Sequence, residues 1–178
     1  MSLSELIYSE VGFDHEAAEQ RLSHYLSRDN FRLAYHLTEQ GFSVLPLCPD
    51  SKRPAVAWKP LQYRLATAQQ LVDWFGENDF WPAIVTGEIS GITVIDCDSP
   101  EAVAAAALAG CFSELGQSTS RGEHFVFRFS DERNTVRVCG MEGVDRRGEG
   151  GYVKAYEDAF TWTRDAVRKA PYLPEQFR

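Results

Sequence analysis

Asp96 and Asp98 follow the apolar stretch Ile92–Ile95 and are separated by a single cysteine. Alternate residues of a β-strand face the same side, so both carboxylates point the same way, and apolar residues on both faces indicate a central strand. At roughly 6–7 Å and an effective dielectric constant near 20, the two charges repel by about 2–3 kcal/mol. We therefore expect a positive charge beside them, and carboxylates of this kind bind hard divalent cations such as Mg²⁺. The alternative is that Asp98 only caps the helix expected after it.

A second group of polar residues, Ser118–His124, leads into the strand expected at His124–Phe129. In that strand three phenylalanines share one face, while His124 and Arg128 lie on the other. A histidine and an arginine beside a loop of Ser, Thr and Gly residues provide the donors and positive charge that a triphosphate requires. The alternative is a histidine at the edge of a strand whose ring hydrogen-bonds to a backbone carbonyl.

The third group is the glycine-rich segment Gly143–Val153, which we expect to be a loop between strands. Its glycines permit close backbone approach or left-handed turns, Arg146 and Arg147 supply charge, and Asp145 supplies a third possible metal ligand. The G-x-x-x-x-G-K-[ST] pattern of a Walker A loop is absent from the sequence. A plain glycine-rich connection accounts for the glycines but not for the acid and the arginines.

These groups are more informative in their order along the chain than separately. The motifs, in order, are Lys52-Arg53-Pro54, Trp58, Val85-Thr86-Gly87, Ser90-Gly91, Asp96-x-Asp98, Ser120-x-Gly122-x-His124 and Asp145-x-Arg147-Gly148-x-Gly150-Gly151-Tyr152-Val153. This series resembles the bifunctional DNA primase/polymerase (Prim-Pol) domain of plasmid and phage replication proteins, which belongs to the archaeo-eukaryotic primase superfamily. The resemblance extends from about Asn30 to Ala155.

The resemblance implies metal-dependent, template-directed nucleotidyl transfer, as primer synthesis, primer extension or both. It implies catalytic acids that bind two Mg²⁺ or Mn²⁺ ions, at Asp96, Asp98 and Asp145. It implies nucleotide-binding residues at His124, Ser120, Arg121, Arg147 and Lys52. The implied partners are a single-stranded DNA template, NTPs or dNTPs, and a replicative helicase domain or protein.

The sequence departs from the family pattern in two places. Arg121 stands where the family commonly has glycine, and Tyr156-Glu157-Asp158 replaces a stretch that is often rich in proline and serine. Two other functions remain open. A divalent-metal nuclease or phosphodiesterase would use the same acids and histidine, and a non-catalytic replication module would bind nucleotide or a helicase.

The elements that must position these residues follow from periodicity and capping signals. The expected helices begin after Asp14, span Asn30–Gln40, run from Thr67 to Gly76, and begin at Ser99. The expected strands are Phe42–Leu47, Ala83–Thr86, Gly91–Asp96, His124–Phe129, Thr135–Val138 and Gly151–Ala155. Because helices and strands mix without strict alternation, we expect a mixed α+β fold. The resemblance implies an RRM-like sheet packed with a second α/β unit.

The chain of 178 residues is long enough for one catalytic domain, expected at 30–178, with a peripheral helical segment at 1–29. A formal charge of −8 argues against a surface that binds DNA everywhere, so template binding is expected to be weak and sensitive to salt. Without a signal sequence or a bilayer-length apolar run, we expect a cytoplasmic protein that does not bind membranes. The four isolated cysteines predict reduced thiols and no structural zinc.

Overall fold

The computed structural model of the chain describes residues 2–12 and 14–178. The helices of this part are α1 (Leu3–Val11), α2 (His15–Ser27), α3 (Asp29–Glu39), α4 (Ala68–Leu71), α5 (Pro100–Leu108) and α6 (Arg164–Lys169). The strands are β1 (Val44–Leu47), β2 (Trp81–Val85), β3 (Ile92–Cys97), β4 (Gly116–Ser118), β5 (Glu123–Arg128), β6 (Val144–Arg147) and β7 (Tyr152–Lys154). None of these helices is long and apolar enough to span a lipid bilayer.

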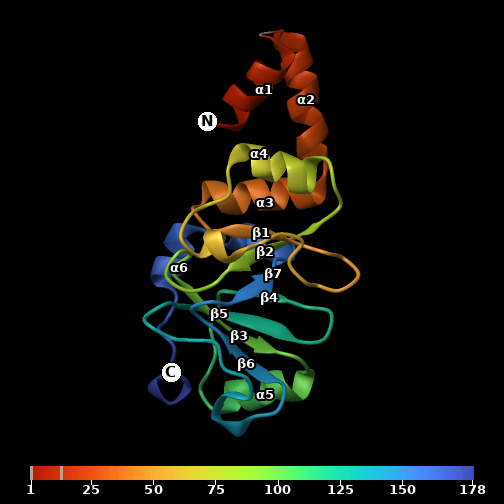
Figure 1. Cartoon of the computed structure of the whole chain (residues 1–178). Helices are drawn as coiled ribbons and strands as arrows, with labels where there is room; N and C mark the ends of the chain where they lie inside the picture. The colour runs from red at the N-terminus through yellow and green to blue at the C-terminus, as the bar shows by residue number, and fades with distance from the viewer. Residues whose placement is uncertain (1, 13) are drawn as a thin grey trace.

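The strands form two antiparallel sheets, which confirms the mixed α+β prediction. The first sheet has the order β1-β2-β7, and the second has the order β4-β5-β3-β6. Figure 1 shows the layers: α3 and α4 lie above the first sheet, the second sheet lies below it, and α5 lies at the bottom. As its apolar faces indicated, β3 is central and pairs with both β5 and β6.

Several predicted helices begin at the capping residues that the sequence indicated. The Asp14 side chain caps α2, and the Ser99 side chain accepts a hydrogen bond from Ala102 N at the start of α5. The Thr67 side chain caps α4, which continues as a π-helical turn, Val72–Gly76. Local capping chemistry therefore fixes these helices close to their predicted limits.

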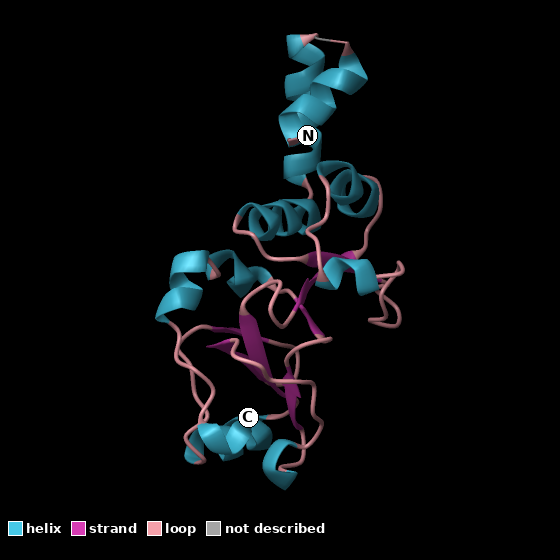
Figure 2. Ribbon diagram, turned by 60° about the vertical axis from the view of Figure 1, so that its left-hand side comes forward, coloured by secondary structure: helices cyan, strands magenta, loops and turns pink. Residues whose placement is uncertain are grey.

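The N-terminal helices α1 and α2 pack against each other and project from the layer of α3 and α4 (Figure 2). Leu6, Ile7 and Tyr25 are buried in the same cluster as the inner residues of α3 and the first sheet. The sequence interpretation missed α1. Its signal was a capping box, in which Ser2 and Glu5 exchange side-chain-to-backbone hydrogen bonds.

Alternation along β3 separates two apolar clusters. Ile92 and Val94 lie in the cluster shared with the first sheet, whereas Ile95 and Cys97 lie in the cluster beneath α5. Asp96 continues the first of these rows, so its carboxylate faces the space between the two sheets. The predicted strand therefore carries the acid to the interior of the fold.

Three features differ from the prediction. Thr135–Val138 is not a strand: Thr135 makes one bridge to Arg146, and the left-handed backbone of Arg137 at φ 51° ends the extended run. The region expected to be a loop contains β6, which places Asp145 on a strand. The strands β2 and β3 belong to different sheets although a short turn joins them, because only Gly87 and Ile92 bridge across that turn.

The chain crosses between the sheets at two places that lie together. The first crossing is the turn from Thr86 to Gly91, and the second is the segment Gly148–Gly151 between β6 and β7. Thr86 N donates to Gly151 O at 3.0 Å, and the Thr86 hydroxyl donates to Gly148 O at 2.6 Å. A Cβ atom on Gly151 would lie 2.8 Å from the Thr86 hydroxyl oxygen, so this approach requires glycine.

Candidate active site

Three polar side chains from adjacent strands lie in one row across the second sheet. Asp96 on β3 is the register partner of His124 on β5 and of Asp145 on β6. Cross-strand partners in an antiparallel sheet share a face, so the three side chains are neighbours. The pairing of strands thus brings together two predicted acids and the predicted phosphate-binding histidine.

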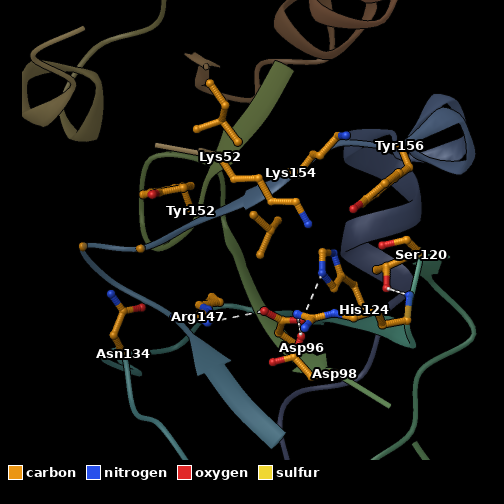
Figure 3. Close-up of a pocket in the computed structure, with 16 residues that line it drawn as sticks. Lys52, Asp96, Asp98, Ser120, His124, Asn134, Arg147, Tyr152, Lys154 and Tyr156 are labelled. Carbon is orange, nitrogen blue, oxygen red and sulfur yellow. Dashed lines mark hydrogen bonds and ion pairs between the residues drawn. The ribbon is translucent and has the colours of Figure 1, made fainter. Parts of the chain in front are cut away.

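Two residues of this row, Asp96 and His124, border a cavity of about 330 Å³ between the two sheets (Figure 3). Its volume lies in the range of small-molecule sites, about 300–1,000 Å³. The polar residues around it are Lys52, Asp96, Asp98, Thr119, Ser120, Arg121, His124, Asn134, Arg147, Tyr152, Lys154 and Tyr156. All predicted site residues except Asp145 line this cavity.

Positive groups lie against each carboxylate, as the expected repulsion required. Asp96 Oδ1 is 3.2 Å from His124 Nε2, and Asp96 Oδ2 is 3.4 Å from an Arg147 guanidinium nitrogen. The same guanidinium is 2.9 Å from Asp145 Oδ2, so Arg147 bridges the two acids. At the other end of the site, Arg121 pairs with Asp98 at 2.5 Å.

Asp96 is the most strongly constrained of these acids. Burial alone would raise the pKa of its carboxyl group, but the hydrogen bond from His124 and the charge of Arg147 outweigh burial. The net pKa of Asp96 lies below its ordinary value, so the group is ionised at neutral pH. The site therefore holds a buried carboxylate in its charged form, which is the form that binds cations.

Gln117, which was not predicted, fixes the orientation of His124. Gln117 Oε1 accepts a hydrogen bond from Tyr156 N at 2.9 Å, and Gln117 Nε2 donates one to Lys154 O at 2.6 Å. These two backbone partners identify which terminal atom of the side-chain amide is the nitrogen. That nitrogen also lies 2.7 Å from His124 Nδ1, which must therefore accept. The ring proton is then on Nε2, where it faces Asp96.

The loop residues are held by their own backbone contacts. The Thr119 hydroxyl accepts from Gly122 N at 3.0 Å and closes the turn that carries Ser120 and Arg121 beside the cavity. Lys52 has a left-handed backbone, φ 54°, and its N–H donates to Cys48 O at 2.8 Å. These local bonds place side chains from two distant loops around the same space.

Asp145 is set slightly apart from the other acids. It does not line the cavity; one of its oxygens meets Arg147, and the other accepts from Arg137 N at 3.0 Å. Asp98 lies just beyond β3, with its backbone N–H bound to Gly143 O and its side chain 42% exposed. The three acids are thus distributed along the site from the interior to the opening.

The sequence that forms this site lies within a match to a known family. Residues 34–175 match the sequence profile described as bifunctional DNA primase/polymerase, N-terminal. The chain belongs to the Prim-Pol family. A search of curated proteins finds no match.

Prim-Pol membership implies DNA primase/polymerase activity, a nucleotidyltransferase reaction on DNA and nucleotides, and metal-dependent catalysis. Among residues 2–12 and 14–178, no three His, Cys, Asp or Glu side chains lie close enough together to hold an ion. The donor chemistry nevertheless fits a divalent cation. Carboxylate oxygens of Asp96, Asp98 and Asp145 are hard ligands, and each is already compensated by a positive guanidinium group.

This Prim-Pol site contains three residues that are not among the predicted site residues: Gln117, Lys154 and Tyr156. Gln117 lies on β4, a strand of three residues that gives no periodic signal. Tyr156 was noted only as a departure from the family pattern, and its ring lies 6.3 Å from that of His124. Lys154 lies on the predicted strand that follows the glycine-rich motif, so its charge was the available signal.

Proposed function

We propose that the chain catalyses metal-dependent, template-directed nucleotidyl transfer, as primer synthesis, primer extension or both. The supporting observation is the row of Asp96, His124 and Asp145 across three strands, of which Asp96 and His124 line a cavity together with Asp98. In such a reaction, two bound metal ions lower the pKa of a primer 3′-hydroxyl and stabilise the pyrophosphate leaving group. Asp96, Asp98 and Asp145 would hold those ions.

The other cavity residues have complementary roles in this proposal. His124 presents Nε2–H near Asp96, where it can donate to a phosphate oxygen of the nucleotide. Arg147 and Arg121 neutralise the acids, and in this proposal they contact the nucleotide phosphates once the acids bind cations. Ser120 and Lys52 line the cavity and complete the proposed nucleotide-binding set.

We extend the proposal to the domain description. The order β4-β5-β3-β6, with α5 following β3, supports an RRM-like sheet in which a loop replaces the second crossover helix. Residues 1–29 are proposed as a peripheral helical segment, and residues 30–178 as the catalytic domain. The proposed partners are single-stranded template DNA and a replicative helicase, in plasmid or phage replication in the cytoplasm.

The test is incorporation of labelled nucleotides on primed and unprimed single-stranded templates with Mg²⁺ or Mn²⁺. We expect Asp96→Asn and Asp98→Asn each to reduce incorporation at least about 100-fold without unfolding the protein. Asp165→Asn is the matched control, because Asp165 pairs with Arg168 on the exposed surface of α6. Product on the unprimed template would establish primer synthesis.

Three outcomes would contradict the proposal. The first is incorporation that persists in both cavity variants. The second is shortening of end-labelled DNA, which would support a nuclease. The third is stabilisation by nucleotide without metal and without incorporation, which would support a binding module.

A further inference from the structure

Two lysines of the cavity lack the acidic partners that its two arginines have. Arg121 and Arg147 each lie within 3.4 Å of a carboxylate oxygen. Among the residues that the structure describes, no carboxylate lies within 4 Å of the side-chain nitrogen of Lys52 or Lys154. The cavity therefore has a compensated acidic side and an uncompensated basic side.

Lys154 is held in place by two aromatic rings. Its Nζ lies 3.2 Å from the centroid of Trp81 and 4.8 Å from that of Tyr156. The attraction between an ammonium group and an aromatic face restrains the side chain without neutralising its charge. The backbone is restrained as well, because Lys154 O accepts from Gln117 and Lys154 pairs with Ala83 on β2.

The surroundings of Lys154 disfavour its positive charge. Desolvation lowers its pKa, and the nearby charge of Lys52 lowers the pKa further. Figure 3 shows both lysines on the side of the cavity opposite Asp96 and Asp98. Two neighbouring ammonium groups without a carboxylate partner in the described part of the chain, of which that of Lys154 is partly desolvated, are stabilised by any anion that contacts both.

We propose that Lys154, acting with Lys52, binds the polyphosphate of a nucleoside triphosphate in this cavity. This inference rests on the proposed function, and it adds Lys154, which lies on β7 of the first sheet, to the proposed nucleotide-binding residues. A polyphosphate carries several charges in a compact group, so one ligand can reach both lysines while its other oxygens face the acidic side. Cations bound by the acids would strengthen this arrangement.

The experiment measures binding directly, with inorganic tripolyphosphate as the probe, in the presence of Mg²⁺ and in its absence. Isothermal titration calorimetry is the readout, because a fluorescence signal from Trp81 would depend on the same ammonium group that Lys154→Gln removes. Hydrogen bonds to charged groups correspond to about a 10- to 100-fold change in affinity, which we expect for Lys154→Gln. Lys154→Arg should lose less affinity for tripolyphosphate than Lys154→Gln, because arginine keeps the positive charge.

The matched control is Lys169→Gln, which removes an exposed lysine of α6 outside the cavity and should leave the affinity unchanged. Circular dichroism checks that each variant is folded. If Lys154→Gln does not fold, the tripolyphosphate affinity of Lys52→Gln tests the same inference. A dT₁₂ oligonucleotide is measured in parallel. Loss of tripolyphosphate binding with oligonucleotide binding retained supports a free nucleotide as the ligand.

The inference is overturned if the wild-type protein does not bind tripolyphosphate, if Lys154→Gln binds it normally, or if only oligonucleotide binding is lost. Its failure is distinguishable from failure of the proposed function. A protein that incorporates nucleotides but whose Lys154→Gln variant binds tripolyphosphate normally refutes this inference alone. A protein that never incorporates nucleotides, yet loses tripolyphosphate affinity in the variant, refutes the catalytic proposal alone.

Discussion

Gln117 donates a hydrogen bond to Nδ1 of His124 across 2.7 Å. Because Gln117 also bonds to the backbone of Lys154 and Tyr156, one buried amide connects the second sheet to the segment that begins with β7. The ring of His124 is thus fixed relative to both sides of the cavity, and its remaining N–H is directed at Asp96. Gln117 is a positioning residue of the proposed site.

Gln117→Glu should change which partner of the Nδ1 contact donates the hydrogen bond, the residue at 117 or His124. A carboxylate can only accept, so Nδ1, which faces it, is expected to become protonated. Nitrogen NMR shifts of the His124 ring report this protonation directly, and nucleotide incorporation should fall together with it. An unprotonated Nδ1, with activity lost, would mean that Gln117 acts only through the stability of the fold.

The lowered pKa of Asp96 predicts how stability depends on pH. The folded state holds the pKa of Asp96 below its ordinary value of 3.8, so the unfolded chain binds more protons in that range. The stabilisation is present above about pH 4 and is lost as the pH falls through the folded-state value. Urea unfolding from pH 2.5 to 6 should show wild type and Asp96→Asn converging at low pH. A constant difference would refute the assignment.

Arg121 should compete with a divalent cation for Asp98. Removing an exposed ion-pair partner changes the free energy by about 0.2–1 kcal/mol, so Arg121→Gln should tighten Mn²⁺ binding by about 1.5- to 5-fold. Electron paramagnetic resonance of free Mn²⁺ measures this without any catalytic assay. Arg168→Gln is the control, since its ion pair with Asp165 lies on the exposed surface of α6. Weaker Mn²⁺ binding in Arg121→Gln would contradict the expected competition.

Arg164 joins α6 to the loops around the first sheet. Its guanidinium group donates to the carbonyl oxygens of Ser90, Ile89 and Gly41, and it lies over the ring of Phe42. Because Arg164→Ala leaves these acceptors unpaired, we expect a loss of about 3 kcal/mol in the free energy of unfolding.

Lysine cannot reproduce the planar fork of arginine, so Arg164→Lys should recover less than half of that loss. Arg168→Ala, on the same helix, should change the free energy of unfolding by less than about 0.5 kcal/mol. Urea denaturation distinguishes the three variants. Equal effects of Arg164→Ala and Arg168→Ala would show that the carbonyl contacts contribute nothing specific.

The sequence was sufficient for the parts of the site that depend on local rules. Alternation placed Asp96 on the inner face of β3, and the same rule placed His124 opposite the buried Phe125 and Phe127. The adjacency of Asp96 and His124 was not predictable from alternation, because it depends on the register of β3 with β5. Family resemblance supplied their common role instead.

The failure to predict β6 has a physical cause. The strand β6 consists of Val144, Asp145, Arg146 and Arg147, so its sequence lacks the apolar alternation that marks a strand. It forms because β3 offers an unpaired edge, and Arg146 is buried by bonds to the carbonyl oxygens of Arg133 and Phe177. Tertiary pairing, rather than local propensity, determines this strand.

The two chain crossings at Thr86–Gly91 and Gly148–Gly151 are hydrogen-bonded to each other, so the two sheets are joined at this point. The acids belong to the second sheet and Lys154 to the first. The distance between these opposite charges is consequently set by the angle between the two sheets at the crossings. A substitution there can change how a ligand is held while every residue that touches the ligand stays the same.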